Sequence, residues 1–263
     1  MDTIRLPDGT QFHCLNRNEA LLLYADLFEE RSYFQCGISL DPGDTVVDVG
    51  ANVGLFALQA SREAEGVRVV SLEPLPPIFS VLEANFALHH IPGVALPCGV
   101  GREDATVEFT FYPANSALSG RFAEPGQDRA LVVQLLRNRF SKLTDAALET
   151  LAARGLVGEP FACRVRPLSD ILREVGVERV GLLKVDVERA ELDVLESLRG
   201  DDWHQIDQVV VEVHDVEHRL RHITELLREK GFEVAHRQGA TFEGTDLYDL
   251  FASRRRRAGE AGR

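Results

Sequence analysis

Seven ionisable residues interrupt or end apolar runs that are typical of buried β-strands. In chain order they are Asp48, Glu73, Lys184, Asp186, Glu188, Glu212 and His214. An unpaired charge in an apolar run is costly, so these side chains are candidates for a functional site. A carboxylate at a strand end can bind sugar hydroxyls. A neutral imidazole, here His214, can take a proton from a hydroxyl group, and Asp186 is the second candidate for that step.

A glycine turn follows the first of these runs. Residues 45–49 are mostly β-branched and apolar, and Gly50-Ala51-Asn52-Val53-Gly54 comes directly after them. Small residues let a ligand approach the backbone, and a helix that begins there adds free N–H groups and partial positive charge. Glu73 ends the next apolar run, about 20 residues further on, where an acidic residue is placed to bind ribose hydroxyls.

The spacing within this turn discriminates among three kinds of ligand. A dinucleotide site requires Gly-x-Gly-x-x-Gly, and the first spacing fails here. A phosphate-binding loop ends in Gly-Lys-Ser/Thr, and no lysine is near. A ligand with a ribose but no phosphate remains, and S-adenosylmethionine is such a ligand. The alternative is a glycine turn that only connects a strand to a helix.

Composition and charge are those of a folded α/β protein. The chain has 263 residues, of which 44% are hydrophobic and 27% charged. Its net charge is −13, and the last ten residues hold five arginines and one glutamate, so the rest carries −17. Such an acidic surface repels phosphate backbones, and no nucleic-acid partner is expected. No apolar run reaches transmembrane length and the N-terminus lacks a basic-then-apolar signal, so we expect no membrane partner and a cytoplasmic location. Cys14, Cys36, Cys98 and Cys163 form no Cys-x-x-Cys pair, which argues against a structural zinc site.

The elements that position these residues alternate between strand and helix. Helix patterns at 53–64 and 77–89 separate strands at 67–72 and 94–98, and similar alternation continues to residue 251. This pattern predicts a mostly parallel sheet with helices on both faces, closed by an antiparallel pair near the C-terminus. We expect a ligand-binding domain over 44–251, an N-terminal cap segment over 1–43 and a disordered basic tail over 252–263.

Residues 120–160 break the alternation. They predict one or two inserted helices, with Thr144 as an N-cap and Gly155 as a stop. The insertion either decorates the sheet edge or forms a lid over a substrate. The pocket of the acceptor is expected between the N-terminal segment and residues 112–160, with Tyr33, Asn115 and Ser116 as candidate polar contacts, although the latter two also suit an ordinary turn.

Four segments together resemble the FkbM-type S-adenosylmethionine-dependent methyltransferases. They are Val46–Gly54, Leu72-Glu73-Pro74, Leu183–Glu191 and Val211–His214. The resemblance covers about residues 44–251, and its most specific element is the Lys-x-Asp-x-Glu-x-x-Glu pattern that begins at Lys184. Arg189 departs from the family pattern, which usually has glycine there. Because a helix start tolerates arginine, we expect little consequence.

The resemblance implies a Rossmann-like class I methyltransferase fold with seven strands. It also implies O-methylation of a hydroxyl on a small-molecule acceptor, a natural product or a sugar, either free or bound to a carrier protein. The implied cofactor-binding residues are Asp48, Gly50, Asn52, Gly54, Glu73, Pro74, Gly99 and Val100. The implied transfer site consists of His214, Asp186 and Lys184 as catalytic residues and Tyr33, Asn115, Ser116, Glu188 and Glu212 as substrate contacts.

Several alternatives stay open at this point. Lys184 and Asp186 can be a structural ion pair, and His214 a core histidine. The carboxylates offer ligands for a divalent metal, but we favour the interpretation that they hold the substrate and the loop, and assign no metal ligand. N-methylation, a non-catalytic adenosine-binding module and a nicotinamide oxidoreductase are the competing functions. The sequence does not indicate the oligomeric state or the acceptor.

Overall fold

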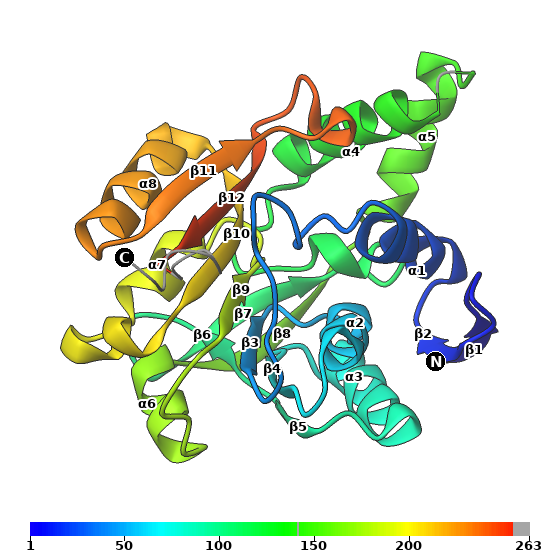
Figure 1. The fold of residues 1–263 in the computed structure, drawn as a ribbon. Coiled ribbons are helices and arrows are strands. Elements are labelled where there is room, and N and C mark those ends of the chain that lie inside the picture. Colours follow the sequence, from blue (N-terminus) through cyan, green and yellow to red (C-terminus); the bar gives the residue numbers. More distant parts are fainter. Residues whose placement is uncertain (141, 255–263) are drawn as a thin grey trace.

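A seven-stranded sheet forms the centre of the molecule (Figure 1). The computed structural model describes residues 1–140 and 142–254. From edge to edge the strands are β11 (Glu233–Arg237), β12 (Leu247–Ser253), β10 (Gln208–His214), β9 (Leu182–Val185), β3 (Thr45–Val49), β4 (Arg68–Leu72) and β5 (Gly93–Leu96). In this sheet β12 runs antiparallel to both of its neighbours, and the other pairings are parallel. The predicted seven-stranded, mostly parallel sheet is confirmed.

Helices cover both faces of the sheet, as the alternation predicted (Figure 1). One face packs against α2 (Leu55–Glu63) and α3 (Pro76–His89), and the other against α6 (Leu168–Glu174), α7 (Glu191–Glu196) and α8 (Arg219–Glu229). Alternate residues of the same strand enter different cores: Val46 belongs to the first, and Val47 to the second. β-branched residues on both faces are typical of parallel strands that are buried on both sides.

The N-terminal segment packs on the first of these helical layers. It contains the hairpin β1 (Asp2–Arg5) and β2 (Gln11–Cys14), then α1 (Arg17–Tyr24) and the π-helix η1 (Ala25–Glu29). Asn16 caps α1 by accepting the backbone N–H groups of Asn18 and Glu19. Phe12 is fully buried in the same core as α2 and α3. This packing places α1 and η1 beside the C-terminal ends of the central strands.

A second, three-stranded sheet was not predicted. It has the order β6 (Gly99–Val100), β8 (Glu159–Arg166), β7 (Ala105–Phe111). The strand pattern at 106–111 is confirmed, but its partner β8 was missed, because Pro160 and the surface arginines of that strand weaken its apolar alternation. Cys163 and Val165 are its buried residues.

The insertion between β7 and β8 forms two helices, α4 (Pro125–Arg139) and α5 (Asp145–Gly155). Thr144 accepts the backbone N–H of Ala147, which confirms the predicted cap, and Gly155 is the last residue of α5. Figure 1 shows α4 beside the tip of the β11–β12 hairpin, which carries the short helix η5 (Ala240–Phe242). We call α4, α5 and η5 together the roof.

Further short 3-10 helices connect the larger elements: η2 (Ser116–Leu118), η3 (Gly200–Gln205) and η4 (Val216–His218). At the C-terminal end, β12 continues to Ser253, so the predicted start of the tail at residue 252 is too early. Arg254 stacks on the ring of Phe232, with its guanidinium carbon 3.9 Å from the ring centroid. The predicted disorder of the tail concerns residues 255–263, which lie outside the described residues.

Candidate active site

A cavity of about 510 Å³ lies at the C-terminal ends of β3, β4, β9 and β10. Ligands of open α/β sheets bind at this edge. The cavity extends from the glycine turn and Glu73 to Asp186 and Glu212, and α1, η1 and the roof enclose it. Most of the predicted site residues line it: Tyr33, Gly50, Asn52, Glu73, Pro74, Gly99, Val100, Asn115, Ser116, Lys184, Asp186, Glu188 and Glu212.

Gly50 brings the glycine turn into contact with the end of β9. Its φ of +77° lies in the left-handed region, and its backbone N–H donates to the carbonyl oxygen of Leu72 at 3.0 Å. A Cβ atom at Gly50 would lie 1.8 Å from the carbonyl oxygen of Asp186. Only glycine therefore lets the turn and the Asp186 backbone approach each other at this point.

Gly54 has a different function from the one predicted. It precedes α2 with a φ of +90°, and a Cβ atom there would lie 2.8 Å from Leu82 on α3. Gly54 is not among the residues that line the cavity. It allows α2 and α3 to pack closely and does not contact the ligand space.

Glu73 follows β4 and is 5% exposed. Its two carboxylate oxygens accept the backbone N–H groups of Asn52, at 3.1 Å, and of Leu75, at 2.9 Å. Burial raises the pKa of Glu73 to about 7, although these two hydrogen bonds act in the opposite direction. Each oxygen keeps a second lone pair, so the carboxylate can still accept hydrogen bonds from two hydroxyl groups in the cavity.

Asp48 lies beneath the cavity rather than in its wall. It is fully buried, and its carboxylate is 3.1 Å from Nζ of Lys184 and 3.2 Å from Oγ of Ser71. The predicted direct contact of Asp48 with the cofactor does not fit this position. Its charge instead balances that of Lys184 in the core of the sheet.

Lys184 connects three parts of the site. Its Nζ donates to the carbonyl oxygen of Gly50 at 2.7 Å and lies 3.6 Å from the carboxylate of Asp186. Burial alone would lower the pKa of Lys184, but the carboxylates of Asp48 and Asp186 outweigh burial and raise it. A permanently protonated lysine cannot act as a base, so Lys184 orients Asp186 and holds the glycine turn.

Asp186 presents its carboxylate to the cavity. The hydroxyl of Tyr33 donates to it at 2.9 Å, and the Tyr33 ring packs edge-on against Phe56. Burial raises the pKa of Tyr33 well above its usual value, so that this hydroxyl remains a donor. Tyr33 was predicted as a substrate contact; in the structure it also fixes the orientation of Asp186.

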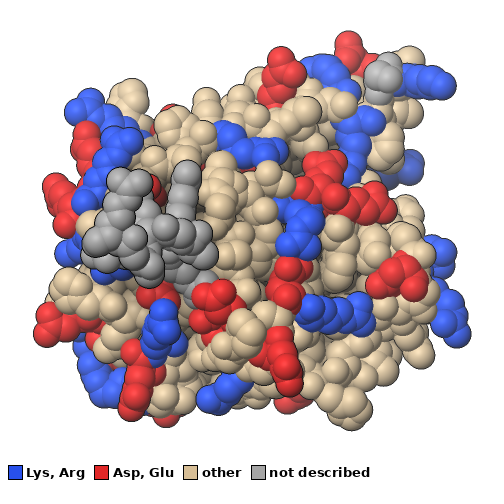
Figure 2. Space-filling view, in the orientation of Figure 1, with Lys and Arg blue, Asp and Glu red and all other residues tan. Residues whose placement is uncertain are grey.

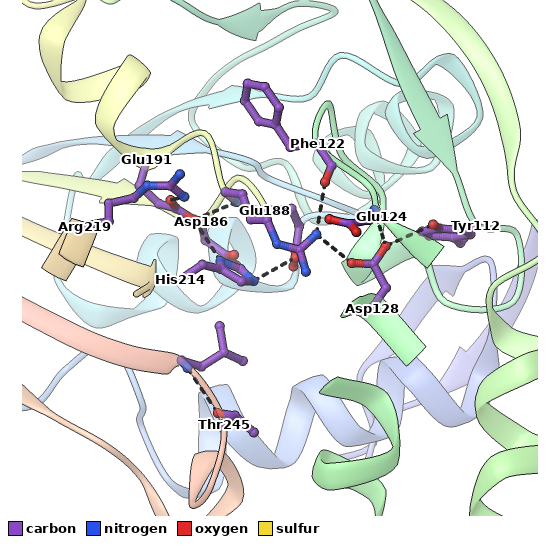
Figure 3. Close-up of polar contacts among 12 residues, drawn as sticks. Tyr112, Phe122, Glu124, Asp128, Asp186, Glu188, Glu191, His214, Arg219 and Thr245 are labelled. Atoms are coloured by element: carbon purple, nitrogen blue, oxygen red, sulfur yellow. Dashed lines mark hydrogen bonds and ion pairs between the residues drawn. The ribbon is translucent and has the colours of Figure 1, made fainter. Parts of the chain in front are cut away.

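His214 lies between the carboxylates of Glu188 and Glu191 (Figure 3). It is not among the residues that line the cavity. Its Nδ1 is 2.9 Å from Glu191, and its Nε2 is 3.2 Å from Glu188. Burial alone would lower the pKa of His214, but these two carboxylates outweigh burial and raise it well above its usual value. An imidazolium has no lone pair for a substrate proton. The predicted use of a neutral His214 as the base therefore does not fit the structure.

This geometry makes the contribution of His214 to stability depend on pH. Because its pKa is raised in the folded chain, the contribution is complete below the unfolded pKa of about 6.5 and disappears as pH rises through the folded pKa. We expect His214→Gln to lower the melting temperature most between about pH 5.5 and 6.5, and less at alkaline pH. Thermal unfolding across this pH series, with the exposed His222→Gln as control, tests this; a difference that widens with rising pH would contradict it.

Three carboxylates converge at the end of the cavity that faces the roof. Asp186, Glu188 and Glu212 each place one oxygen so that the three lie within 4.8 Å of one another. Burial, and then the charges of Asp186 and Asp249, raise the pKa of Glu212 well above its usual value. Asp249 lies opposite Glu212 in the β10–β12 pairing and also lines the cavity. Sequence reasoning missed Asp249, because it occurs in an edge-like alternating strand far along the chain.

The glycine turn is connected to the N-terminal segment through Glu19, which the sequence did not reveal. The carboxylate of Glu19 accepts the backbone N–H of Ala117 at 2.7 Å and lies 3.0 Å from the hydroxyl of Ser116. That hydroxyl is also 3.2 Å from the side-chain oxygen of Asn52. The hydroxyl of Ser116 therefore contacts Glu19 of the N-terminal segment and Asn52 of the glycine turn. Asn115, which precedes it, lines the cavity and makes no side-chain cap of η2.

Apolar side chains form much of the remaining wall. They come from α1 and η1 on one side and from the roof on the other, and they are Leu22, Leu23, Leu27, Val132, Leu135, Leu136, Phe140, Leu151 and Phe242. The roof is attached to its surroundings near the C-terminal end of α4. Asn138 donates to the carbonyl oxygens of Thr241 and Glu243, and Arg139 pairs with Asp26 of η1 at 3.0 Å.

The sequence profile described as the methyltransferase FkbM domain matches residues 48–234 of this chain. The chain belongs to the FkbM methyltransferase family. It is 39% identical to the 31-O-demethyl-FK506 methyltransferase FkbM of Streptomyces tacrolimicus over 254 residues, which are 97% of each chain. It is 40% identical over 265 residues to the AMB antimetabolite synthetase AmbE of Pseudomonas aeruginosa, and this match covers 95% of the chain and 12% of AmbE. A solved structure of a methyltransferase FkbM from Methylobacillus flagellatus is similar, with a TM-score of 0.48 and 16% identity over 89% of this chain and 52% of the other.

Arg189 was expected to have little consequence, but it connects two parts of the structure. α7 begins at Glu191, so Arg189 precedes the helix and adopts a φ of +71°. Its guanidinium pairs with Asp128 of α4 at 2.7 Å and donates to the carbonyl oxygen of Phe122 at 3.0 Å. Figure 3 shows Asp128 also receiving a hydrogen bond from Tyr112. The arginine therefore joins the loop of Glu188 to the roof, in a backbone conformation that disfavours any side chain.

Figure 2 shows acidic and basic side chains interspersed on the visible face, without a continuous basic patch of the kind that binds phosphate backbones. Among the helices of the described residues, none has the length and apolar character needed to span a membrane.

Proposed function

We propose that the chain transfers a methyl group from S-adenosylmethionine to a hydroxyl oxygen of a largely apolar small molecule. The observation that supports this most directly is that one continuous cavity joins Glu73 and the glycine turn to Asp186 and Glu212. Membership of a methyltransferase family accounts for the donor. The apolar wall and the carboxylates supply an acceptor pocket and a proton acceptor.

The donor end of the cavity has the features that an adenosine with a methionine arm requires. The free lone pairs of Glu73 suit the two ribose hydroxyls. A Cβ atom at Gly99 would lie 3.1 Å from Val165 and 3.2 Å from Phe109, so the backbone forms the cavity wall there without a side chain. Gly50 and Asn52 border the path that the methionine arm would take towards Asp186.

At the acceptor end, Asp186 is the group suited to remove the hydroxyl proton. S-adenosylmethionine supplies an electrophilic methyl group, so the acceptor oxygen forms the new C–O bond while the C–S bond breaks and its electron pair stays on sulfur. The hydroxyl proton passes to the Asp186 carboxylate. Tyr33 and Lys184 hold that carboxylate in place, and the main contribution of the protein is the alignment of the two reactants.

The names of two relatives support a proposal for the kind of acceptor. The FkbM of Streptomyces tacrolimicus is named for O-methylation of a demethylated FK506, and AmbE is named as a synthetase. By analogy, we propose a natural-product hydroxyl, either in a free molecule or in one attached to a carrier protein. The apolar side chains of α1, η1 and the roof would contact the carbon skeleton of such an acceptor.

Incubation of the full chain with S-adenosylmethionine labelled in the methyl group tests this function. A panel of apolar alcohols, hydroxy acids and matching amines is analysed by mass spectrometry. A labelled methyl group on oxygen supports the proposal, and methylation of the amines alone replaces it with N-methylation. Binding of S-adenosylhomocysteine without any methylated product would favour a non-catalytic binding module.

Glu73→Gln isolates the contribution of the ribose contacts. The amide retains one acceptor oxygen but also presents an NH₂ group to the hydroxyls and to the backbone N–H groups. We therefore expect the affinity for S-adenosylhomocysteine to fall by about 10- to 100-fold, since each lost charge-assisted hydrogen bond is worth about 1.5–3 kcal/mol. Isothermal titration calorimetry measures this. Glu83→Gln, an exposed change on α3, is the matched control and should bind like the wild type.

A further inference from the structure

We propose that Asp186, Glu188 and Glu212 hold a divalent cation at the acceptor end of the cavity, with Asp249 beside them as a further oxygen donor. The use we assign to this cation rests on the proposed function, but its binding does not. Sequence reasoning favoured a carboxylate cluster that contacts the substrate directly. The arrangement of the four side chains favours the cation instead.

The spacing of the three carboxylates suits one ion. One oxygen from each of Asp186, Glu188 and Glu212 lies within 4.8 Å of the other two. Oxygens on opposite sides of one Mg²⁺ or Ca²⁺ ion are about 4 to 5 Å apart, and adjacent ones are closer. The three residues come from the loop after β9 and from β10, which the parallel pairing of the two strands holds in register.

Asp249 is a second, independent indication of a cation. It is 4% exposed and lines the cavity, and its Cα pairs directly with that of Glu212 across β10 and β12. Over the described part of the chain, neither of these two carboxylates has a side-chain hydrogen bond or an ion pair. Arg237 lies opposite Asp249 in the β11–β12 pairing and lowers the pKa of Asp249 through its charge, without a hydrogen bond or ion pair to it. Two buried carboxyl groups side by side either keep a proton or require a positive charge between them, and a bound cation supplies that charge.

Two of the cationic side chains nearby, Lys184 and His214, already contact carboxylates. Lys184 is bonded to Gly50 and paired with Asp48, and the ring nitrogens of His214 both face carboxylates. Because His214 does not line the cavity, we assign it no part in binding the metal. A site built from carboxylate oxygens alone selects hard cations such as Mg²⁺, Mn²⁺ or Ca²⁺ over Zn²⁺.

A cation at this position would lie where the acceptor hydroxyl must approach Asp186. Its charge lowers the pKa of a neighbouring hydroxyl group and fixes the direction of the oxygen. Glu188 links this site to the roof, because its neighbour Arg189 pairs with Asp128.

Binding of Mn²⁺ alone to the full chain tests the proposal without turnover. The electron paramagnetic resonance signal of free Mn²⁺ is titrated with protein, with and without S-adenosylhomocysteine. We expect one bound Mn²⁺ per chain and an affinity that falls by about tenfold or more in both Glu212→Gln and Asp249→Asn. Glu108→Gln, an exposed change on β7, should bind like the wild type.

The outcomes separate this proposal from the proposed function. No stoichiometric Mn²⁺ binding, or unchanged binding in both cluster variants, would overturn the cation site. S-adenosylhomocysteine binding by the variants shows that they are folded. If the chain binds Mn²⁺ but methylates no acceptor, the cation site is supported and the proposed function is refuted. If methyl transfer continues unchanged in EDTA and no Mn²⁺ binds, only the cation site is refuted.

Discussion

Asp186→Asn should lower kcat by about 100-fold or more while leaving the affinity for S-adenosylhomocysteine close to that of the wild type. The amide has nearly the same shape and still accepts the hydrogen bond from Tyr33. It cannot take up a hydroxyl proton, however, and the Lys184 ammonium loses one of its two carboxylates. Because the donor end of the cavity depends on Glu73 and the glycine turn, donor binding should be retained. Single-turnover kinetics with a methylated product identified by mass spectrometry measures the rate.

Asp201→Asn is the matched control, since Asp201 is exposed on η3 and remote from the cavity. An Asp186→Asn variant that turns over at the wild-type rate would refute the assignment of Asp186 as proton acceptor. A variant that also loses S-adenosylhomocysteine binding would show that Asp186 acts on the donor instead.

Gly50→Ala should cause the largest loss of stability among single methyl additions in the site. The new Cβ would lie 1.8 Å from the carbonyl oxygen of Asp186 and 2.9 Å from its carbonyl carbon, and both are backbone atoms that cannot rotate away. Either the turn or the end of β9 must move, and both carry site residues. We expect a decrease of about 3 kcal/mol or more in the free energy of unfolding, measured by urea denaturation, together with loss of donor binding.

Gly43→Ala separates steric overlap from backbone strain. Gly43 has a φ of +81°, close to that of Gly50, but no atom lies within 4 Å of the position that an added methyl group would occupy. Its replacement should cost only the left-handed conformation of the backbone, about 1–2 kcal/mol. If Gly50→Ala were no more destabilising than Gly43→Ala, the close approach of the turn to Asp186 would have no energetic importance.

The central sheet, and the position of Gly50 and Glu73 at one cavity, could be predicted because their signals are local. The valine-rich runs define strands that are buried on both faces. The sequence separation of Gly50 and Glu73 is that expected between the ends of two successive strands joined by a helix. The carboxyl ends of those strands must then lie at one edge of the sheet. These steps require no knowledge of how distant segments pack.

The acceptor end could not be derived in this way, because it depends on contacts between distant segments. Asp249 gains its importance from antiparallel pairing with Glu212, and Glu19 from a hydrogen bond to Ala117, far along the chain. His214 looked like a base because the sequence does not show that Glu188 and Glu191 occupy both of its nitrogens. Little consequence was expected of Arg189 because the sequence suggested that a helix begins there. In the structure this residue precedes the helix and its backbone is left-handed.

The contacts of the roof with the rest of the chain determine which segments must be replaced together in a chimeric protein. The α4 helix is hydrogen-bonded to the tip of the β11–β12 hairpin through Asn138 and joined to the loop of Glu188 through Asp128 and Arg189. A chimera that imports only the insertion of another FkbM protein would leave these attachment points mismatched. Transfer of a new acceptor preference would therefore require residues 112–155, the hairpin tip at 239–245 and position 189 to be replaced as one unit. If the cavity binds the acceptor as proposed, its shape on this side depends on three separate segments rather than on a single loop.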